Sequence, residues 1–274
     1  MKFLSRFYIF IIFAILYAPI LLVILFSFNA SGSLSHFSGF SLYWYKDLFR
    51  NAEAITALKN SLILAVSSSL LATIFGTLAA FSIAHSKNKY YQGIMRSVSN
   101  IPMMNPDIVT GVSMMLLFVG VAAMIGLGDV LGMWTMLIAH TTFNLPYVIL
   151  SILPKFKQMD KHLIEAALDL GCTPTQTFFR IELPSILPGI ISGLMMSFTL
   201  SLDDFVISHF VSSPDFKTLP LYIYNQTAHE VKFSMYALCT LMIFAILLLL
   251  IAVNVAGGKK DRAEKAKRLK GGKR

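Results

Sequence analysis

The chain has 274 residues, of which 56% are hydrophobic and only 14% are charged. A soluble domain of this length carries about 25% charged residues, and here the apolar residues form long runs between short polar segments, so the composition excludes an ordinary soluble domain and predicts a membrane protein. The net charge is +9, but nine of the Lys and Arg residues lie in residues 259–274, which we interpret as a cytoplasmic tail compatible with anionic membrane lipid rather than as a nucleic-acid site.

Six apolar segments are each close to the roughly 20 residues that cross a bilayer as a helix. We predict spans at 7–28, 61–84, 130–153, 186–211 and 233–256, and a further span that begins between Ser97 and Ile108 and ends near Ala123. The first segment is longer than a signal peptide needs and lacks a clear cleavage site, so we interpret it as a retained span. The predicted fold class is an all-α membrane protein with six transmembrane helices in one domain, 1–258, followed by the tail, 259–274.

The Lys and Arg residues predict the orientation of the spans. Six spans place both termini on one side of the membrane, and that side carries 18 of the 23 Lys and Arg residues against five on the other. Basic residues accumulate in cytoplasmic loops. Both termini are therefore expected in the cytoplasm.

The cytoplasmic segment 154–188 contains a local helix pattern that can be predicted from its residues alone. Asp160 can cap a short helix that runs through Leu170, and Leu163, Ala167 and Leu170 then share one face at helical spacing. Gly171 follows as a helix stop, where only a residue that tolerates positive φ fits easily.

A second helix is predicted directly after Gly171. Thr173 opens it, Pro174 occupies its first turn, and Gln176 stands where a capping box requires it. Pro184 and Pro188 are expected to end it. The result is a compact helix–turn–helix that shows small and apolar residues to water, and a partner is expected to cover such a surface.

At this segment the chain resembles the permease subunits of ATP-binding-cassette (ABC) importers, which carry the pattern E-A-A, three residues, Gly, nine residues, I-x-L-P. The matching residues are Glu165, Ala166, Ala167, Gly171, Ile181, Leu183 and Pro184. The resemblance implies the type I ABC importer permease fold. It also implies that these residues form a coupling helix which docks onto a cytoplasmic ABC ATPase dimer.

The chain itself contains no G-x-x-x-x-G-K-[ST] phosphate-binding loop. ATP hydrolysis is therefore expected on the partner ATPase, which would hold ATP and Mg²⁺, and the chain is not expected to be an enzyme. The six histidines show no spacing typical of zinc ligands, so no metal or other cofactor is predicted on this chain.

Three carboxylates lie within the predicted spans: Asp107, Asp203 and Asp204. A charged side chain at the bilayer centre costs about 2.5–3.5 kcal/mol on insertion scales, so each is a candidate for the substrate pathway. Pro102 and Pro106 interrupt the helix beside Asp107, an arrangement common at transport sites; alternatively, Asp107 caps a span that begins at Ile108.

Aromatic residues are candidates for cation–π contacts with a cationic substrate, chiefly Tyr17 in the first span and Trp44 in the first external loop. Tyr43 and Tyr45 accompany Trp44. The alternative for all of them is an aromatic belt at the membrane interface. His140 is expected to be a hydrogen-bonded structural residue rather than a proton relay.

Over most of its length the chain is similar to permeases of spermidine/putrescine importers. The stretches that carry this similarity are 106–109, the coupling segment, 197–204 and 219–222. It implies a polyamine substrate, a sister permease subunit with which this chain forms a heterodimer, and an extracellular or periplasmic polyamine-binding protein. Importers of ferric iron, sulfate or phosphonates share the coupling pattern, so these solutes are the alternative substrates.

Two other classes remain open at the level of sequence. The stretch 126–129 matches the G-x-G-D motif of intramembrane aspartyl proteases, but it is expected to form a short external turn, and the usual Tyr-Asp partner motif is missing. A secondary transporter or channel would not need the coupling segment. Both are weaker interpretations than an import permease.

Overall fold

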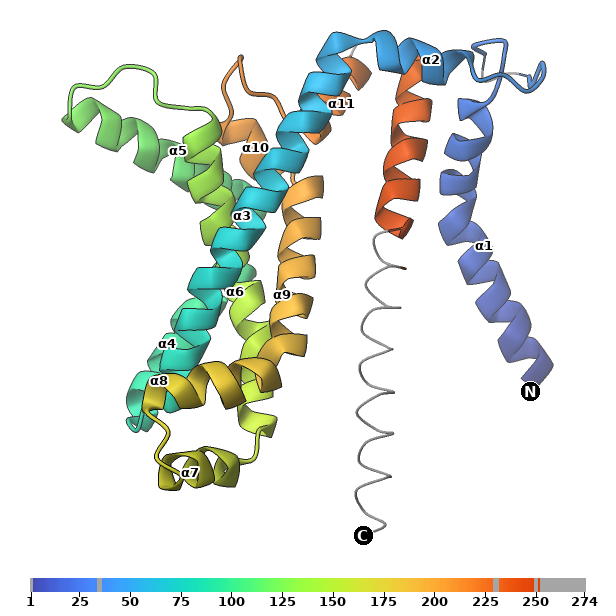
Figure 1. Cartoon of the computed structure of the whole chain (residues 1–274). Coiled ribbons are helices and arrows are strands. Elements are labelled where there is room, and N and C mark those ends of the chain that lie inside the picture. Colours follow the sequence, from blue (N-terminus) through green and yellow to red (C-terminus); the bar gives the residue numbers. More distant parts are fainter. Residues whose placement is uncertain (1, 34–35, 229–231, 249–250, 252–274) are drawn as a thin grey trace. The chain divides into compact units, whose positions relative to one another are not determined.

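The structure, a computed structural model, describes residues 2–33, 36–228, 232–248 and 251 (Figure 1). The predicted basic tail, 259–274, lies outside these residues. The chain divides into two compact units: Met1–Thr56 with Ile223–Arg274, here called the terminal unit, and Ala57–Tyr222, called the central unit. The described residues are almost entirely helical and contain two isolated β-bridges but no strand, which confirms the all-α prediction.

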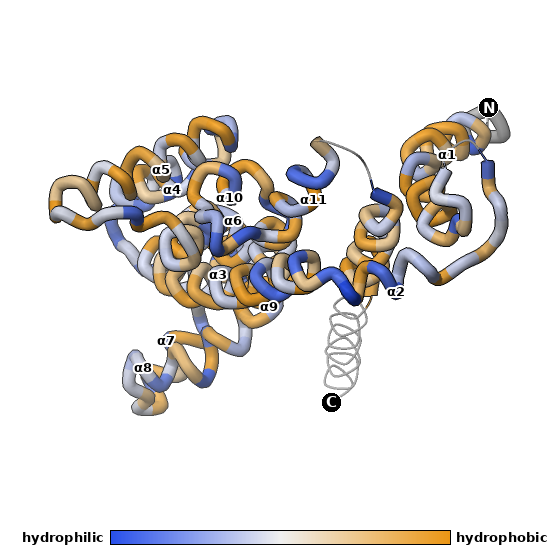
Figure 2. Tube along the Cα trace, turned by 90° about the horizontal axis from the view of Figure 1, so that it is seen from above, coloured by the Kyte–Doolittle hydropathy of each residue, from blue (hydrophilic) through white to orange (hydrophobic). Residues whose placement is uncertain are grey.

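The terminal unit contains α1 (Lys2–Ser27), α2 (Tyr43–Arg50) and a helix over Phe233–Leu248. Within α1, the stretch Arg6–Ser27 is apolar and long enough to cross a bilayer, which matches the predicted first span. Figure 2 shows that hydrophobic residues dominate α1, whereas hydrophilic residues gather in the connecting segments.

The loop between α1 and α2 is organised around the fully buried Asn29. Its Nδ2 donates hydrogen bonds to the carbonyl oxygens of Ser33 (2.8 Å) and His36 (2.9 Å), and its own carbonyl oxygen accepts a 2.8 Å bond from Trp44 Nε1. Gly32 has a φ of +59°, and Trp44 packs beside it. These contacts fix the described residues on either side of Gly32 against α2.

The central unit is built from longer helices, which pack through small residues. Its elements are α3 (Ala52–His85, which starts in the terminal unit), α4 (Lys89–Met104), α5 (Asp107–Met124), α6 (Met133–Gln158), α7 (Lys161–Asp169), α8 (Pro174–Thr177), η1 (Phe178–Glu182, a π-helix), α9 (Leu183–Asp203), α10 (Val206–Val211) and α11 (Leu219–Thr227, which ends in the terminal unit). At Gly189 of α9 a Cβ would lie 2.9 Å from the carbonyl oxygen of Ser151, so a glycine is needed for α9 to approach α6 this closely. Ala72, Val148, Ile152 and Ile186 are fully buried around this contact.

Five helices in the described residues are long and apolar enough to cross a membrane. They are Arg6–Ser27, Ala52–His85, Asp107–Met124, Met133–Gln158 and Pro174–Asp203. The helix Phe233–Leu248 begins where the sixth span was predicted, but residues 252–256 of that span lie outside the described part. The count of six spans and the cytoplasmic placement of the termini therefore stay predictions.

The structure shows a helix break in the region where the sequence left the start of the third span open. The chain is helical on both sides of Asn105 and Pro106, as α4 and α5, and the two helices are separated at that dipeptide. Pro106 has no N–H to donate and disfavours a helical conformation at Asn105, which explains the position of the break.

Two predicted helix boundaries were wrong. The fifth span does not continue as one helix to residue 211, because α9 ends at Asp203 and α10 begins at Val206. In addition, Pro184 and Pro188 do not end the second helix of the loop, since Pro174–Asp203 is helical throughout. Leu183 N–H bonds to the carbonyl oxygen of Phe178, five residues back, and this π register lets the chain pass into α9 at Pro184.

Candidate functional site

The segment 160–177, which was predicted to lie in the cytoplasm, folds as the local rules predict. The side chain of Asp160 accepts a 3.0 Å hydrogen bond from the backbone N–H of His162, and α7 follows from Lys161 to Asp169. Gly171 adopts a φ of +86°, a conformation that L-residues other than glycine rarely adopt. The predicted cap and helix stop are both confirmed.

The second helix of the segment begins with the predicted capping box. Thr173 N–H donates to Gln176 Oε1 (3.1 Å), and Gln176 N–H donates to Thr173 Oγ1 (3.3 Å), with Pro174 in the first turn of α8. α7 packs against α8 and η1. Two short capped helices joined at Gly171 therefore form a well-defined projection from the long helices.

Exposure divides the motif residues of this segment into two groups. Glu165, Ala166 and Gly171 are exposed, and a Cβ at Gly171 would meet no atom within 4 Å. Ala167 is only 4% exposed, so it packs α7 against the rest of the chain and shows no surface to a partner. Leu170 is 86% exposed. The available surface is thus small, apolar and edged by the carboxylate of Glu165.

The I-x-L-P end of the motif serves as an anchor. Ile181 and Leu183 are half-buried, Pro184 is exposed, and Leu183 packs on the core of buried residues around Ile186. These residues connect the projecting segment to α9.

A residue pair at this junction was missed by the sequence reasoning. Glu182, the variable position of I-x-L-P, is 3% exposed, and its Oε2 lies 3.2 Å from Nε2 of His85, the last residue of α3. His85 Nδ1 lies 3.1 Å from the carbonyl oxygen of Phe81. The only hint in the sequence was an acid in an apolar context at the inner end of one span and a histidine at the inner end of another.

The helices that follow the two breaks of the central unit, α5 and α10, pack against each other. At Gly111 of α5 a Cβ would lie 2.9 Å from Phe210 Cδ2 and 3.4 Å from the carbonyl oxygen of Val206. Glycine therefore permits this approach. Asp107 lies in the exposed first turn of α5, where a carboxylate interacts favourably with the helix dipole.

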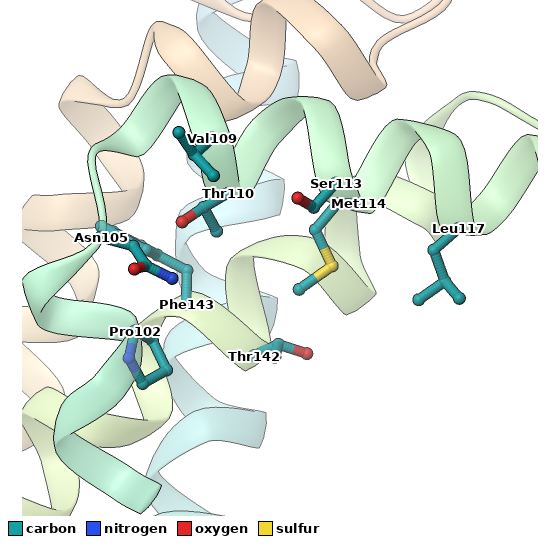
Figure 3. Close-up of a pocket in the computed structure, with 9 residues that line it drawn as sticks. All are labelled: Pro102, Asn105, Val109, Thr110, Ser113, Met114, Leu117, Thr142 and Phe143. Atoms are coloured by element: carbon teal, nitrogen blue, oxygen red, sulfur yellow. The ribbon is translucent and has the colours of Figure 1, made fainter.

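A pocket of about 250 Å³ lies beside the break between α4 and α5. Figure 3 shows Pro102 and Asn105 at the end of the pocket nearest the break, and Leu117 at the opposite end. Thr142 and Phe143 of α6 complete the wall. The pocket is mainly apolar with a few amide and hydroxyl groups, and no carboxylate lines it.

Asp203 and Asp204 occupy different environments. Asp203 is the last residue of α9 and is exposed. Asp204 follows the end of α9, and its two carboxylate oxygens accept backbone N–H bonds from Ile207 (3.2 Å) and Ser208 (2.8 Å). Asp204 therefore caps α10, whereas Asp203 is exposed.

The buried His140 links Asp204 to two further helices. Its Nε2 lies 3.5 Å from Asp204 Oδ2 and 3.3 Å from Ser208 Oγ, and its Nδ1 lies 2.8 Å from Ser201 Oγ. Ser201 Oγ lies 2.9 Å from Ser68 Oγ of α3. The network joins α3, α6, α9 and α10, so His140 is a hydrogen-bonded structural residue, as predicted.

The aromatic candidates lie in the terminal unit and are described there by themselves. Tyr17 is 53% exposed and stacks on Phe13 with ring centroids 6.0 Å apart. Trp44 donates its indole N–H to Asn29 and packs on Phe233, with centroids 5.5 Å apart. Trp44, in α2, is thus held by the loop before it and by the helix over Phe233–Leu248, and both residues stay candidates for the pathway.

The stretch 126–129 forms a connection between α5 and α6. Gly126 has a φ of +73°, and Asp129 is exposed and accepts a 3.2 Å hydrogen bond from the backbone N–H of Leu131. Gly126 allows the backbone conformation of the turn, and the carboxylate of Asp129 accepts a hydrogen bond within the connection. This arrangement favours a connecting turn over a protease site.

Capped helices that project from a bundle of apolar helices, together with two helices broken beside carboxylates, define a membrane transport subunit. Residues 72–258 match the family of binding-protein-dependent transport system inner membrane components, and the chain belongs to that family. It is therefore an inner-membrane protein of bacteria.

Curated relatives cover most of the chain. The putrescine transport system permease protein PotI of Escherichia coli K12 is 39% identical over 234 residues, which are 85% of this chain and 83% of that protein. The spermidine/putrescine transport system permease protein PotC of Haemophilus influenzae is 38% identical over 259 residues, 94% of this chain and 98% of that protein. PotC of E. coli K12 is 35% identical over 254 residues, 92% of each chain.

Solved structures show the same fold at low sequence identity. A chain of a bacterial ABC transporter that imports the polysaccharide alginate superposes with a TM-score of 0.74 at 19% identity, covering 95% of both chains. A chain of the MetNI methionine ABC transporter gives a TM-score of 0.60 at 17% identity, covering 81% of this chain and 98% of that one. The fold of ABC importer permeases, expected from the coupling motif, is thereby confirmed.

Proposed function

We propose that the chain is the transmembrane permease subunit of an ATP-driven importer of polyamines, spermidine and putrescine. It forms the translocation pathway with a sister permease, takes substrate from an external binding protein, and is driven by a cytoplasmic ABC ATPase dimer that holds ATP and Mg²⁺. The chain spans the membrane six times with both termini in the cytoplasm, and it carries out no chemistry itself.

The projecting segment carries the proposal of an ATPase partner. Two capped helices stand outside the bundle, and their exposed residues Glu165, Ala166 and Gly171 are those at which the sequence matches the coupling pattern. Small side chains permit close approach of a partner, and the capping bonds fix the helices before docking, so little ordering is needed on binding.

The polyamine proposal rests on the relatives and on the exposed carboxylates. PotI and PotC are named for putrescine and spermidine transport. In the central unit Asp107 and Asp203 each lie at a helix break and are exposed, with no ion-pair partner among the described residues. A carboxylate without a cation of its own in a low-dielectric pathway attracts an amine strongly.

Uptake by membrane vesicles tests the proposal. Vesicles that contain the chain with its partner subunits are expected to accumulate labelled spermidine or putrescine when ATP is supplied to the ATPase side. Glu165→Lys is expected to abolish uptake and to release the ATPase from the purified complex, whereas Lys87→Glu, also an exposed charge reversal on the cytoplasmic side, is expected to retain both. Import of ferric iron, sulfate or phosphonate in place of polyamine would reject the substrate and keep the permease role.

A further inference from the structure

A second pocket, of about 160 Å³, lies between α4 and α6. It contains neither helix break and none of the three intramembrane carboxylates. One side is polar and the other apolar, a division typical of a site at a membrane interface. The polar side is formed by Arg96, Ser99, Asn100 and Lys157, and the apolar side by Ile149, Leu150, Leu153 and Pro154.

One buried donor of this pocket, on Arg96, lacks a partner in the described residues. Arg96 Nη2 donates a 3.2 Å hydrogen bond to Gln92 Oε1, but Arg96 Nε is buried and has no hydrogen-bond partner among the described residues. Within the described residues, neither Arg96 nor Lys157 forms an ion pair with a carboxylate. A buried N–H group without a hydrogen-bond acceptor raises the free energy of the folded state. We therefore expect a ligand from outside the chain to supply the acceptor.

The position of the pocket indicates what this acceptor is. Lys157 lies in the last turn of α6, and Arg96 lies near the middle of α4, the helix that follows the connection from α3. Both residues lie on the cytoplasmic side in the proposed orientation. Basic pockets between transmembrane helices on that side bind the phosphate groups of anionic lipids.

We propose that the pocket between Arg96 and Lys157 binds the headgroup phosphate of an anionic phospholipid. The guanidinium and the ammonium group hold the phosphate oxygens, Ser99 and Asn100 contact the rest of the headgroup, and the acyl chains lie along the apolar side. A soluble phosphate would gain nothing from Ile149, whereas a phospholipid uses both sides of the pocket.

The site is separate from the substrate pathway. Two cations without counter-charges repel a polyamine, so the pocket would be a barrier rather than a binding site for the proposed substrate. The inference therefore goes beyond the proposed function and would stand for an importer of any solute. A lipid held here links α4 to α6 and so supports the helix that leads to Asp107.

Native mass spectrometry of the assembled importer in detergent tests the site. Phosphatidylglycerol and phosphatidylcholine with the same acyl chains are titrated separately, and we expect at least one phosphatidylglycerol to bind about tenfold more tightly than phosphatidylcholine. The double variant Arg96→Gln with Lys157→Gln is expected to lose this preference. The double variant Lys87→Gln with Lys89→Gln removes two exposed charges near the start of α4, outside the pocket, and is expected to keep it.

Several results would overturn the proposal. Equal binding of the two lipids by the unaltered importer would show that no anionic headgroup is recognised, and this comparison needs no variant to fold. Displacement of phosphatidylglycerol by an equal concentration of inorganic phosphate would make the ligand a soluble anion. Loss of the preference for phosphatidylglycerol in both double variants would show that general surface charge causes it. If lipid binds the isolated chain but not the assembled importer, the pocket is a contact with a partner subunit.

Discussion

Asp204 Oδ2 lies 3.5 Å from Nε2 of the buried His140, whereas the carboxylate of Asp203, one residue earlier, is exposed. The break between α9 and α10 produces this separation, because Asp204 leaves the helix and turns inward to accept the N–H groups of α10. The adjacent acids therefore have different tasks. Asp204 fixes the break, and we propose that Asp203 is the acid that meets a substrate.

Asp203→Asn is expected to impair transport without impairing the fold. Loss of one pathway carboxylate should raise the KM for polyamine uptake about tenfold, which corresponds to about 1.4 kcal/mol, while the melting temperature of the purified protein stays unchanged. Asp204→Asn is the matched variant, and it should lower the melting temperature because both carboxylate oxygens accept backbone N–H bonds and an amide nitrogen cannot replace one of them as acceptor. Equal effects of the two substitutions on KM and on stability would contradict this division.

Gly111→Leu is expected to separate α5 from α10. A Cβ at this position would lie 2.9 Å from Phe210 Cδ2, so the larger side chain should cost about 1–3 kcal/mol through overpacking. A lower melting temperature and reduced uptake are the measured outcomes. Gly120→Leu serves as the control on the same helix, because a Cβ at Gly120 would meet no atom within 4 Å, and it should leave both quantities unchanged.

The coupling segment could be predicted from the sequence because its determinants are local. Asp160, Thr173 and Gln176 bond to backbone or side-chain groups within three residues of themselves, and the φ of Gly171 follows from its place after a helix. Apolar runs likewise place the long helices, since span length depends only on composition over about 20 residues.

The break at Asp204 could not be predicted in the same way. Nothing in the run of residues around 203–205 ends a helix as Pro106 does, and the inward turn is stabilised by His140 and Ser208, of which His140 is remote in sequence. The π register at 178–182 is similarly stabilised by a partner on α3, which the sequence does not reveal. Contacts between residues remote in sequence therefore determine the break at Asp204 and the π register at 178–182, which local sequence patterns do not predict.

Gly171→Ala is expected to weaken coupling. The positive φ of +86° disfavours a residue with a Cβ, at a cost of about 1–2 kcal/mol, so the turn between α7 and α8 should shift. ATP hydrolysis stimulated by the substrate-loaded binding protein and the number of polyamines imported per ATP should both fall. Gly93→Ala, in the exposed part of α4 with open space around it, should leave both quantities as they are.

The pair His85–Glu182 is expected to be energetically coupled, because Glu182 is buried and its carboxylate lies 3.2 Å from the imidazole. His85→Ala and Glu182→Ala should each lower the melting temperature, and the double variant should be no worse than Glu182→Ala alone, since the interaction has already been removed. The pair His162–Glu165, at 3.3 Å but 87% and 69% exposed, offers the matched cycle and should show additive, near-zero effects on stability. Additive effects in the His85–Glu182 cycle would mean that the two side chains act independently. In the assembled importer, Glu182→Gln should preserve ATP hydrolysis while lowering uptake per ATP, because this pair joins the coupling segment to α3 where α9 begins.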